Sequence, residues 1–360
     1  MKVNVKYLMP GCILLDDVYI RTNSPLIKKK TVLTDLHISM LKIFLVSHVF
    51  VESNLVNGTS FKPEEVLNDE EERIDNNNDK TVEFIDLYLS AVQQYKRMFK
   101  NWQGGTKIEA YAIRKIFLPL YDFNPNREHL IQLHHYGTKN DYIYYHAVAV
   151  SILCSSMGRK LNLTNGEIIQ LGLSGLLSDC GMSKITLSVF DKKSPLTVEE
   201  YNEVKDHTIL GYKMLEEVPG FSKGTLMGVL QHHERVDGSG YPLKLESNKI
   251  HLFAKIIAVC DIYHAMTSER NYRTKQSPYK VLEALKKDVF VKIDHEIFDH
   301  FFHLISGLSI GRKVRLNSGE TGEIVFIDNN NPTRPIIKSS DGSMLNTVNE
   351  PNIFIEEVVD

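Results

Sequence analysis

Residues 232–242 read HHERVDGSGYP, and this stretch decides how the rest of the chain is interpreted. It combines two histidines, two acids and two glycines before an aromatic-proline turn. Neighbouring residues on a helix point about 100° apart, so His232 and His233 are expected to do different jobs around one site. The glycines let the backbone leave the helix and present Tyr241. Core packing does not require this combination, although turn packing is an alternative explanation for Tyr241.

Other candidate metal ligands lie in apolar segments on both sides of this stretch. Polar side chains that project from apolar helix faces into a bundle core are how helical proteins build metal centres. Each residue taken alone is also compatible with a polar group satisfied within the core. Four histidines without a matching partner, 134, 135, 300 and 303, are interpreted as surface residues. The six candidate ligands are His146, Asp179, His207, His232, His233 and Asp261.

Residues 81–306 carry almost only helical signals. Hydrophobic residues recur at helical spacing, and Ser277 followed by Pro278 marks a helix start. Three threonines, each followed three residues later by a glutamate, predict capping boxes. They are Thr106 with Glu109, Thr164 with Glu167, and Thr197 with Glu200.

The flanking regions have different patterns. Residues 1–56 alternate short apolar runs with turn signals and predict a small α/β module. Residues 57–80 contain NDEEERIDNNNDK, which is too polar to fold alone and is interpreted as an acidic linker. Residues 307–360 contain alternating strands separated by turn signals and predict a small β module. The fold class is therefore mainly α, with a small module at each end.

Composition limits the possible functions. The 360 residues are 42% hydrophobic and 24% charged, as in a globular protein of two or three domains, and the net charge of -3 gives no reason to expect DNA or an acidic membrane as partner. The four cysteines form no CxxC pair and suit reduced thiols. The start lacks a signal-peptide core, and the apolar run 36–51 is too short and too polar to span a bilayer. We therefore expect a cytoplasmic protein.

Residues from about 141 to 304 resemble the HD-GYP domain, a bacterial signalling branch of the HD metal-dependent phosphohydrolases that hydrolyses cyclic di-GMP. HHExxDGxGYP is the signature of that family, and every fixed position is present. His146 and His207 match two further family histidines, and Asp261 matches the metal-binding aspartate. The resemblance implies a helical bundle of HD type that binds cyclic di-GMP or a related nucleotide.

The resemblance also implies a cofactor and partners. Two or three divalent cations about 3.5–4 Å apart would serve hydrolysis of a phosphodiester. Imidazole and carboxylate ligands suit iron or manganese, and zinc is compatible with them. Contact with diguanylate cyclase domains is suggested by resemblance alone, and a homodimer stays open. The residues implied for substrate binding are Gly240, Tyr241, Pro242, Arg270 and Arg273. A solvated surface or a structural ion pair is the alternative explanation for the two arginines.

The chain departs from the family pattern at the name-giving His-Asp pair, which here reads Ser178-Asp179. The aspartate that would bridge two metals is kept, and the histidine ligand beside it is lost. The lysine of HDxGK is Met182, and Lys184 lies about 200° around a helix from that position. Two acids of the family pattern are also replaced, one by His264 and one by Tyr142.

Three hypotheses follow from this combination. The first is a degenerate HD-GYP protein with fewer metal ions than a complete site, which binds the nucleotide and hydrolyses it weakly or not at all. The second is a working cyclic di-GMP phosphodiesterase in which the remaining ligands suffice. The third is a protein-interaction scaffold that binds neither metal nor nucleotide.

Overall fold

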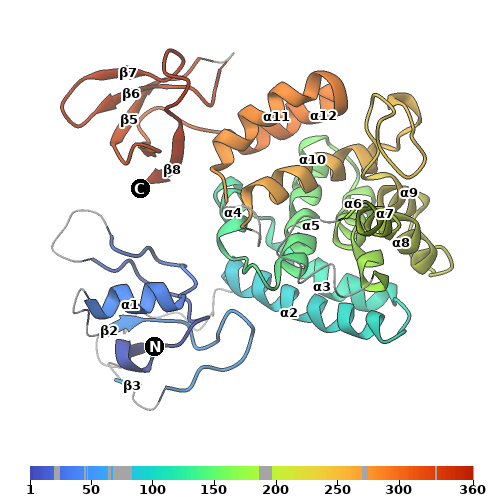
Figure 1. Ribbon diagram of the computed structural model, residues 1–360, viewed down its shortest axis with the longest axis horizontal. Helices are drawn as coiled ribbons and strands as arrows, with labels where there is room; N and C mark the ends of the chain where they lie inside the picture. Colours follow the sequence, from blue (N-terminus) through green and yellow to red (C-terminus); the bar gives the residue numbers. More distant parts are fainter. Residues whose placement is uncertain are drawn as a thin grey trace. The chain divides into compact units, whose positions relative to one another are not determined.

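The computed structural model describes residues 1–19, 25–43, 46, 48–63, 66–67, 83–185, 197–269, 275–328 and 331–359 (Figure 1). The chain forms two compact units, Met1–Gln94 and Tyr95–Asp360, and the division falls within helix α2 (Phe84–Gln103). No helix among the described residues is both long enough and apolar enough to cross a membrane.

The first unit contains a small antiparallel sheet. Strand β1 (Lys2–Asn4) lies between β2 (His48–Phe50) and β3 (Val66–Leu67), and helix α1 (Asp35–Ile43) precedes β2. Its core gathers aliphatic residues that include Val3, Leu41 and Val51. Strand β3 lies within the stretch predicted as a linker, and residues 68–80 of that stretch are outside the described residues.

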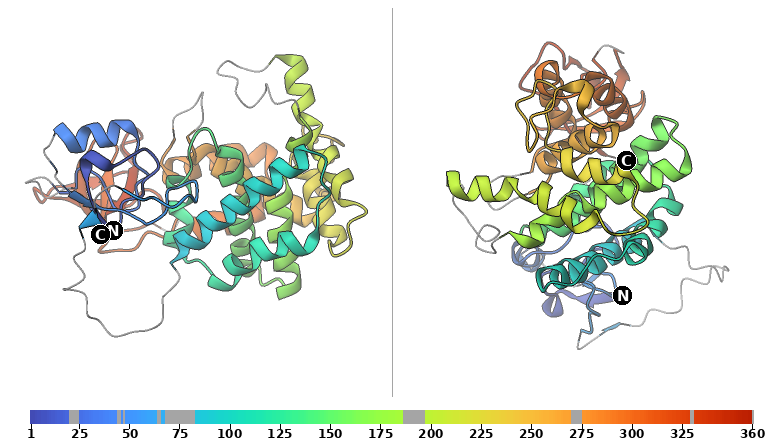
Figure 2. Two further views of the ribbon diagram at one scale, coloured as in Figure 1. Left: turned by 90° about the horizontal axis from the view of Figure 1, so that it is seen from below. Right: turned by 90° about the vertical axis from the view of Figure 1, so that its right-hand side faces the viewer.

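The second unit is built mainly of helices, which confirms the predicted fold class. Helix α5 contacts α6 and α10, α9 contacts α6, α8 and α10, and Figure 2 shows α3 lying against α5 and α6. The helices that follow α2 are α3 (Ala110–Phe123), α4 (Arg127–Gln132), α5 (Tyr142–Lys160), α6 (Asn165–Leu177), α7 (Val198–Lys205), α8 (His207–Leu215), α9 (Lys223–Gln231), α10 (Leu252–Thr267), α11 (Pro278–Lys292) and α12 (His295–Ile305).

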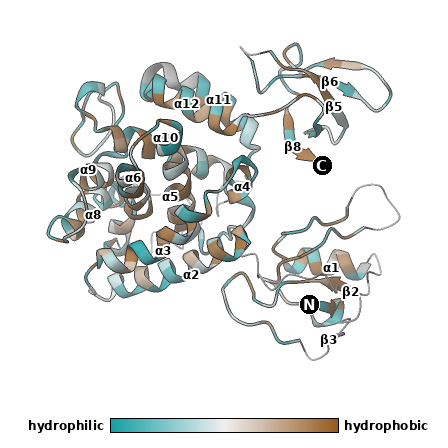
Figure 3. Cartoon of the chain, turned by 180° about the vertical axis from the view of Figure 1, so that it is seen from behind, coloured by the Kyte–Doolittle hydropathy of each residue, from teal (hydrophilic) through white to brown (hydrophobic). Residues whose placement is uncertain are grey.

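Helix α5 is the buried centre of this unit. All residues from 145 to 158 are buried, since the helix is hydrophobic on nearly every side and is covered by its neighbours (Figure 3). Gly175 on α6 permits the close approach of the two helices, because a Cβ there would lie 3.2 Å from the Ser151 Cα. His146, near the start of α5, is therefore held in a packed core.

A five-stranded antiparallel sheet completes the second unit. Its strand order is β7-β6-β5-β4-β8, with β4 (Lys313–Leu316), β5 (Thr321–Phe326), β6 (Ile336–Ser339), β7 (Met344–Asn346) and β8 (Ile355–Val359). Tyr279 of α11 is part of the hydrophobic core of this sheet. The Ser277 hydroxyl donates a hydrogen bond of 2.6 Å to the Ile355 carbonyl. The sheet and α11 therefore share one core.

Two of the three predicted capping boxes are confirmed. Thr164 and Thr197 cap α6 and α7 with reciprocal hydrogen bonds to the glutamates three residues later. Thr106 does not cap α3, which begins at Ala110 with Glu109 at its cap. The amide of Thr106 donates to the Asn101 carbonyl, so this threonine belongs to the turn that ends α2.

Candidate metal centre

The turn after α6 places Asp179. This residue is the N-cap of the 3-10 helix η3 (Cys180–Lys184), which lies against α8. The close approach needs glycine, since a Cβ at Gly181 would lie 2.0 Å from the His207 carbonyl oxygen. The packing of η3 on α8 therefore brings the Asp179 carboxylate beside the imidazole of His207.

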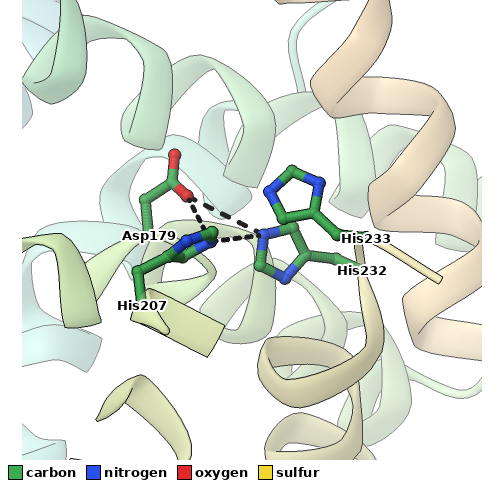
Figure 4. A group of neighbouring side chains, drawn as sticks. All are labelled: Asp179, His207, His232 and His233. Carbon is green, nitrogen blue, oxygen red and sulfur yellow. Dashed lines mark hydrogen bonds and ion pairs between the residues drawn. The ribbon is translucent and has the colours of Figure 1, made fainter. Parts of the chain in front are cut away.

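His207 and His232 point their Nε2 atoms at the same oxygen of Asp179 (Figure 4). His207 is the first residue of α8, and His232 directly follows α9. The Nε2 atoms lie 3.3 and 3.7 Å from Asp179 Oδ1, and they are 3.3 Å from each other. The packing of α8 against α9 thus joins two distant parts of the sequence in one cluster.

The other ring nitrogen of each histidine determines its tautomer. Nδ1 of His207 donates to the Val204 carbonyl at 2.6 Å, and Nδ1 of His232 donates to the Val229 carbonyl at 2.8 Å. A carbonyl only accepts, so each neutral ring carries its proton on Nδ1 and presents the Nε2 lone pair to the cluster. Two lone pairs and one carboxylate oxygen then converge, which is a donor set that fits a cation.

His233 completes this cluster. One ligand atom from each of Asp179, His207, His232 and His233 lies within 4.8 Å of the others. Burial lowers the pKa of His233, and the neighbouring His232 and His207 lower this pKa further. Burial also lowers the pKa of His207, although the Asp179 carboxylate opposes this shift. The neutral imidazole that results is the form that binds a metal.

The second oxygen of Asp179 faces a different pair of residues. Asp179 Oδ2 lies 3.7 Å from Nε2 of His146 on α5, and this Nε2 lies 2.8 Å from Asp261 Oδ1 on α10. Burial raises the pKa of the Asp179 carboxyl, but the hydrogen-bonding contact with His232 and the electrostatic interactions with His207 and His146 outweigh burial and hold this pKa below its ordinary value. Asp179 therefore lies between two groups of residues, which we call the His207 side (207, 232 and 233) and the His146 side (146 and 261).

His146 differs from the other two histidines at its Nδ1 atom. This nitrogen lies 2.9 Å from the Tyr142 hydroxyl and 2.9 Å from His264 Nδ1, and both of these groups can donate a proton. In the part of the chain that the structure describes, no carbonyl oxygen contacts this nitrogen to fix a proton on it. If Nδ1 accepts, the proton lies on Nε2, where it is donated to Asp261 and leaves no lone pair for a metal.

Ser178 adds no ligand to the His146 side. Its side chain is buried, and its hydroxyl donates to the Gly175 carbonyl at 3.0 Å within the last turn of α6. The neighbouring thiol of Cys180 is also buried, and burial raises its pKa, so it stays a neutral thiol. The residues beside Asp179 thus supply neither an imidazole nor a thiolate.

The two acids of HHERVDGSGYP accept hydrogen bonds that stabilise the loop after His233. The buried Glu234 carboxylate accepts the backbone N–H groups of Leu243 at 2.6 Å and Leu245 at 2.9 Å. Asp237 accepts from the amide and hydroxyl of Ser239. A Cβ at Gly240 would lie 2.4 Å from the Arg235 nitrogen, so only glycine fits this turn. The loop stacks the Tyr241 ring on His233, with ring centroids 4.7 Å apart and planes at 29°.

Comparison with protein families agrees with this arrangement, since residues 127–297 match the family described as HD domain. We refer to these matched residues as the HD domain. A cyclic di-GMP phosphodiesterase of Pseudomonas aeruginosa is 33% identical over 198 residues, which cover 54% of this chain and 47% of that protein. The cyclic di-GMP phosphodiesterase PdeB of Borreliella burgdorferi is 29% identical over 197 residues, which cover 55% and 52%. The chain therefore spans about half the length of these relatives.

A solved structure shows the same fold as the HD domain and its surroundings. It is an HDG“Y”P protein from Bdellovibrio bacteriovorus, 16% identical, with a TM-score of 0.50 over 85% of this chain and 99% of that chain. At this identity the likeness concerns the fold alone.

The HD domain brings all six predicted ligands into the two sides around Asp179, and it places Tyr241 against His233. Arg270 and Arg273 lie outside the described residues, so their role stays a prediction. The Lys184 ammonium contacts the Trp102 carbonyl of α2. It is therefore engaged in packing the HD domain against α2.

The sequence reasoning missed the contacts of Tyr142 and His264. It treated both as lost acids, whereas in the HD domain both contact His146. The signal was available, because Tyr142 stands four residues before His146 and His264 stands three residues after Asp261. Residues at those spacings share a helix face, so each pair faces the same site.

Proposed function

We propose that this chain binds cyclic di-GMP or a related cyclic dinucleotide at an HD-GYP site that holds fewer metal ions than a complete one. In this proposal the chain hydrolyses the nucleotide weakly or not at all and acts by binding. The observation that carries it is the difference between the two sides of Asp179. The His207 side presents lone pairs, whereas the His146 side has a serine at 178 and a histidine bonded to Tyr142, His264 and Asp261.

The His207 side supports the binding of one divalent cation. Its three imidazoles together with the Asp179 carboxylate form a set of donors that suits iron, manganese or zinc. A cation there would supply positive charge to a phosphate oxygen of the nucleotide. Asp179, His207 and His232 would hold it, and the stacked Tyr241 would shape the space beside it.

The His146 side supports the weak activity. Hydrolysis by a pair of metals needs the second ion to neutralise charge on the attacking and leaving oxygens. Ser178 is too short to reach a metal as an imidazole would, and its hydroxyl is bonded to Gly175. His146 has three hydrogen-bonding partners of its own, so binding a metal would require it to give up at least the Asp261 contact.

A working phosphodiesterase is the second candidate. Two observations favour it: six ligands still gather around Asp179, and two relatives are named as cyclic di-GMP phosphodiesterases. Three measurements on the full chain separate the candidates. They are metal content per chain, affinity for cyclic di-GMP, and turnover to linear pGpG with added manganese or iron. We expect one metal ion per chain, clear binding and very slow turnover.

Restoring the lost residues is the sharper test. We expect Ser178→His combined with Met182→Lys to raise metal content toward two ions per chain and to increase turnover, because the first change adds an imidazole beside Asp179. Elemental analysis and product formation from cyclic di-GMP measure the two effects. The matched control is Ser178→Ala with Met182→Leu, which should change neither. If the restored double variant folds but gains neither metal nor turnover, the proposal is contradicted.

A further inference from the structure

Lys205 is a cation at the edge of the candidate metal centre. It is the last residue of α7 and stands two residues before His207. Its ammonium lies 4.3 Å from the ring centroid of Tyr201 and 5.7 Å from that of Tyr241. The Tyr241 ring in turn stacks on His233, so one aromatic ring separates the ammonium from the metal cluster.

The ammonium of Lys205 has no carboxylate partner among the described residues. The side chain is partly buried, and its polar end is oriented by two aromatic rings rather than by an acid. Cation–π contacts of this kind position a lysine but leave its hydrogen-bond donors unused. An unpaired cation beside a metal cluster is therefore available to an anionic ligand.

Tyr201 adds an open aromatic surface to the same place. It stands four residues before Lys205 on α7, and 49% of its surface is exposed. Large exposed aromatic residues beside a cation are typical of sites that bind nucleotides, because a base stacks on the ring while the phosphate meets the charge. The chemistry of a cyclic dinucleotide, with two phosphodiesters and two purines, matches this pair.

We infer that Lys205 binds a phosphate of the dinucleotide and that Tyr201 stacks on one of its bases. This inference rests on the proposed function and adds two residues of α7 to the substrate site. Lys205 thereby supplies the positive charge that the family pattern places at position 182, where this chain has methionine. Lys184 does not supply it, since its ammonium contacts Trp102.

Binding measured on the metal-loaded full chain tests this inference. Lys205→Met should weaken cyclic di-GMP binding by about 10-fold or more, because a charge-assisted hydrogen bond is lost. It should also make the affinity less dependent on salt. Tyr201→Ala should weaken binding by about 5-fold or more, and Tyr201→Phe should keep the affinity because the ring is retained. Lys213→Met, an exposed lysine on α8, is the matched control and should bind as the unaltered chain does.

A second nucleotide separates phosphate from base recognition. 3'3'-cGAMP has the same phosphodiesters with one different base, so Lys205→Met should weaken the binding of both nucleotides by the same factor. A loss confined to one nucleotide overturns the phosphate assignment. Unchanged affinity in Lys205→Met, at unchanged metal content, overturns the inference but leaves the proposed function standing. If the unaltered chain binds neither nucleotide, the proposed function itself fails and the inference falls with it.

Discussion

The imidazoles of His207 and His232 differ from that of His146 in the hydrogen-bond partner of the Nδ1 atom. In His207 and His232, Nδ1 donates to a carbonyl oxygen of the preceding turn, whereas Nδ1 of His146 faces a hydroxyl and another imidazole. A backbone carbonyl cannot change its role as acceptor, but a hydroxyl or an imidazole can donate or accept. A backbone carbonyl thus fixes the Nδ1 proton of the two histidines on one side of Asp179 and not that of His146 on the other.

This difference predicts unequal effects of two equivalent substitutions. His232→Ala should remove most of the bound metal, because it deletes one of the lone pairs that converge near Asp179 Oδ1. His146→Ala should leave the metal content close to that of the unaltered chain. Elemental analysis after gel filtration measures both, and the melting temperature controls for folding. Equal loss of metal in the two variants would contradict the one-ion arrangement.

At the residue scale, the sequence indicated which side chains gather but not how they are bonded. The apolar segments around His146, Asp179 and Asp261 indicated a shared site only in combination with the run HHERVDGSGYP. The roles of Glu234 and Asp237 were not predictable, since a carboxylate in a motif serves a metal or a backbone amide equally well. Only the distances to Leu243, Leu245 and Ser239 distinguish the two uses.

The short helices show where patterns of spacing stop being informative. Thr106 and Thr164 are both followed three residues later by glutamate, but only Thr164 caps a helix. The Thr106 amide donates a hydrogen bond to the Asn101 carbonyl at the end of α2, a contact that local sequence does not reveal. The same limit applies to His134 of η2 (Leu133–His135), interpreted from sequence as a surface residue and found buried.

The burial of His134 predicts a dependence of stability on pH. Burial lowers the pKa of His134 well below its ordinary value, and the neighbouring His135 and Lys275 lower it further. When the pH falls below about 6.5, the unfolded chain binds a proton at this residue and the folded chain does not. The folded state therefore loses stability as the pH falls, by at most about 1.4 kcal/mol per pH unit for one such group.

Urea unfolding at pH 7.5 and 5.5, with a chelator at both, measures this loss. His134→Gln should reduce the difference between the two pH values, because the group that titrates is removed. Part of the difference in stability between the two pH values should remain, because burial also lowers the pKa values of His207 and His233. His303→Gln is the control, since half of that side chain is exposed. An unchanged pH difference in His134→Gln would show that the residue is protonated equally in both states.

At the scale of the whole molecule, the C-terminal sheet is fastened to the helices at several points. Arg334 pairs with Glu283 of α11 through two hydrogen bonds of 2.6 and 2.5 Å, and it also donates to the Ile353 carbonyl. Arg127 of α4 donates to the Gly307 carbonyl. The sequence predicted a β module from strand alternation, but it had no signal for these contacts, which join residues far apart in the chain.

Tyr279 is the residue whose loss should reveal this attachment. Tyr279→Ala should lower the free energy of unfolding by about 3–5 kcal/mol, because it removes a buried aromatic side chain from the core of the sheet. Denaturant titration measures the change. Tyr111→Ala, at a position that is 78% exposed, should be close to neutral. Similar small losses in both variants would mean that the sheet does not depend on α11.

The shared core of α11 and the sheet has a consequence for how this protein can be shortened. The HD domain match ends at residue 297, within α12, and α12 itself ends at Ile305. A truncation after residue 306 would strip Tyr279 of its neighbours and leave Glu283 without Arg334. The loss of packing around α11 would also destabilise α10, because α10 packs on α11 and carries Asp261. The C-terminal strands therefore support the helices that carry the candidate metal ligands, and a chain that ends at residue 306 is expected to be less stable than the whole chain.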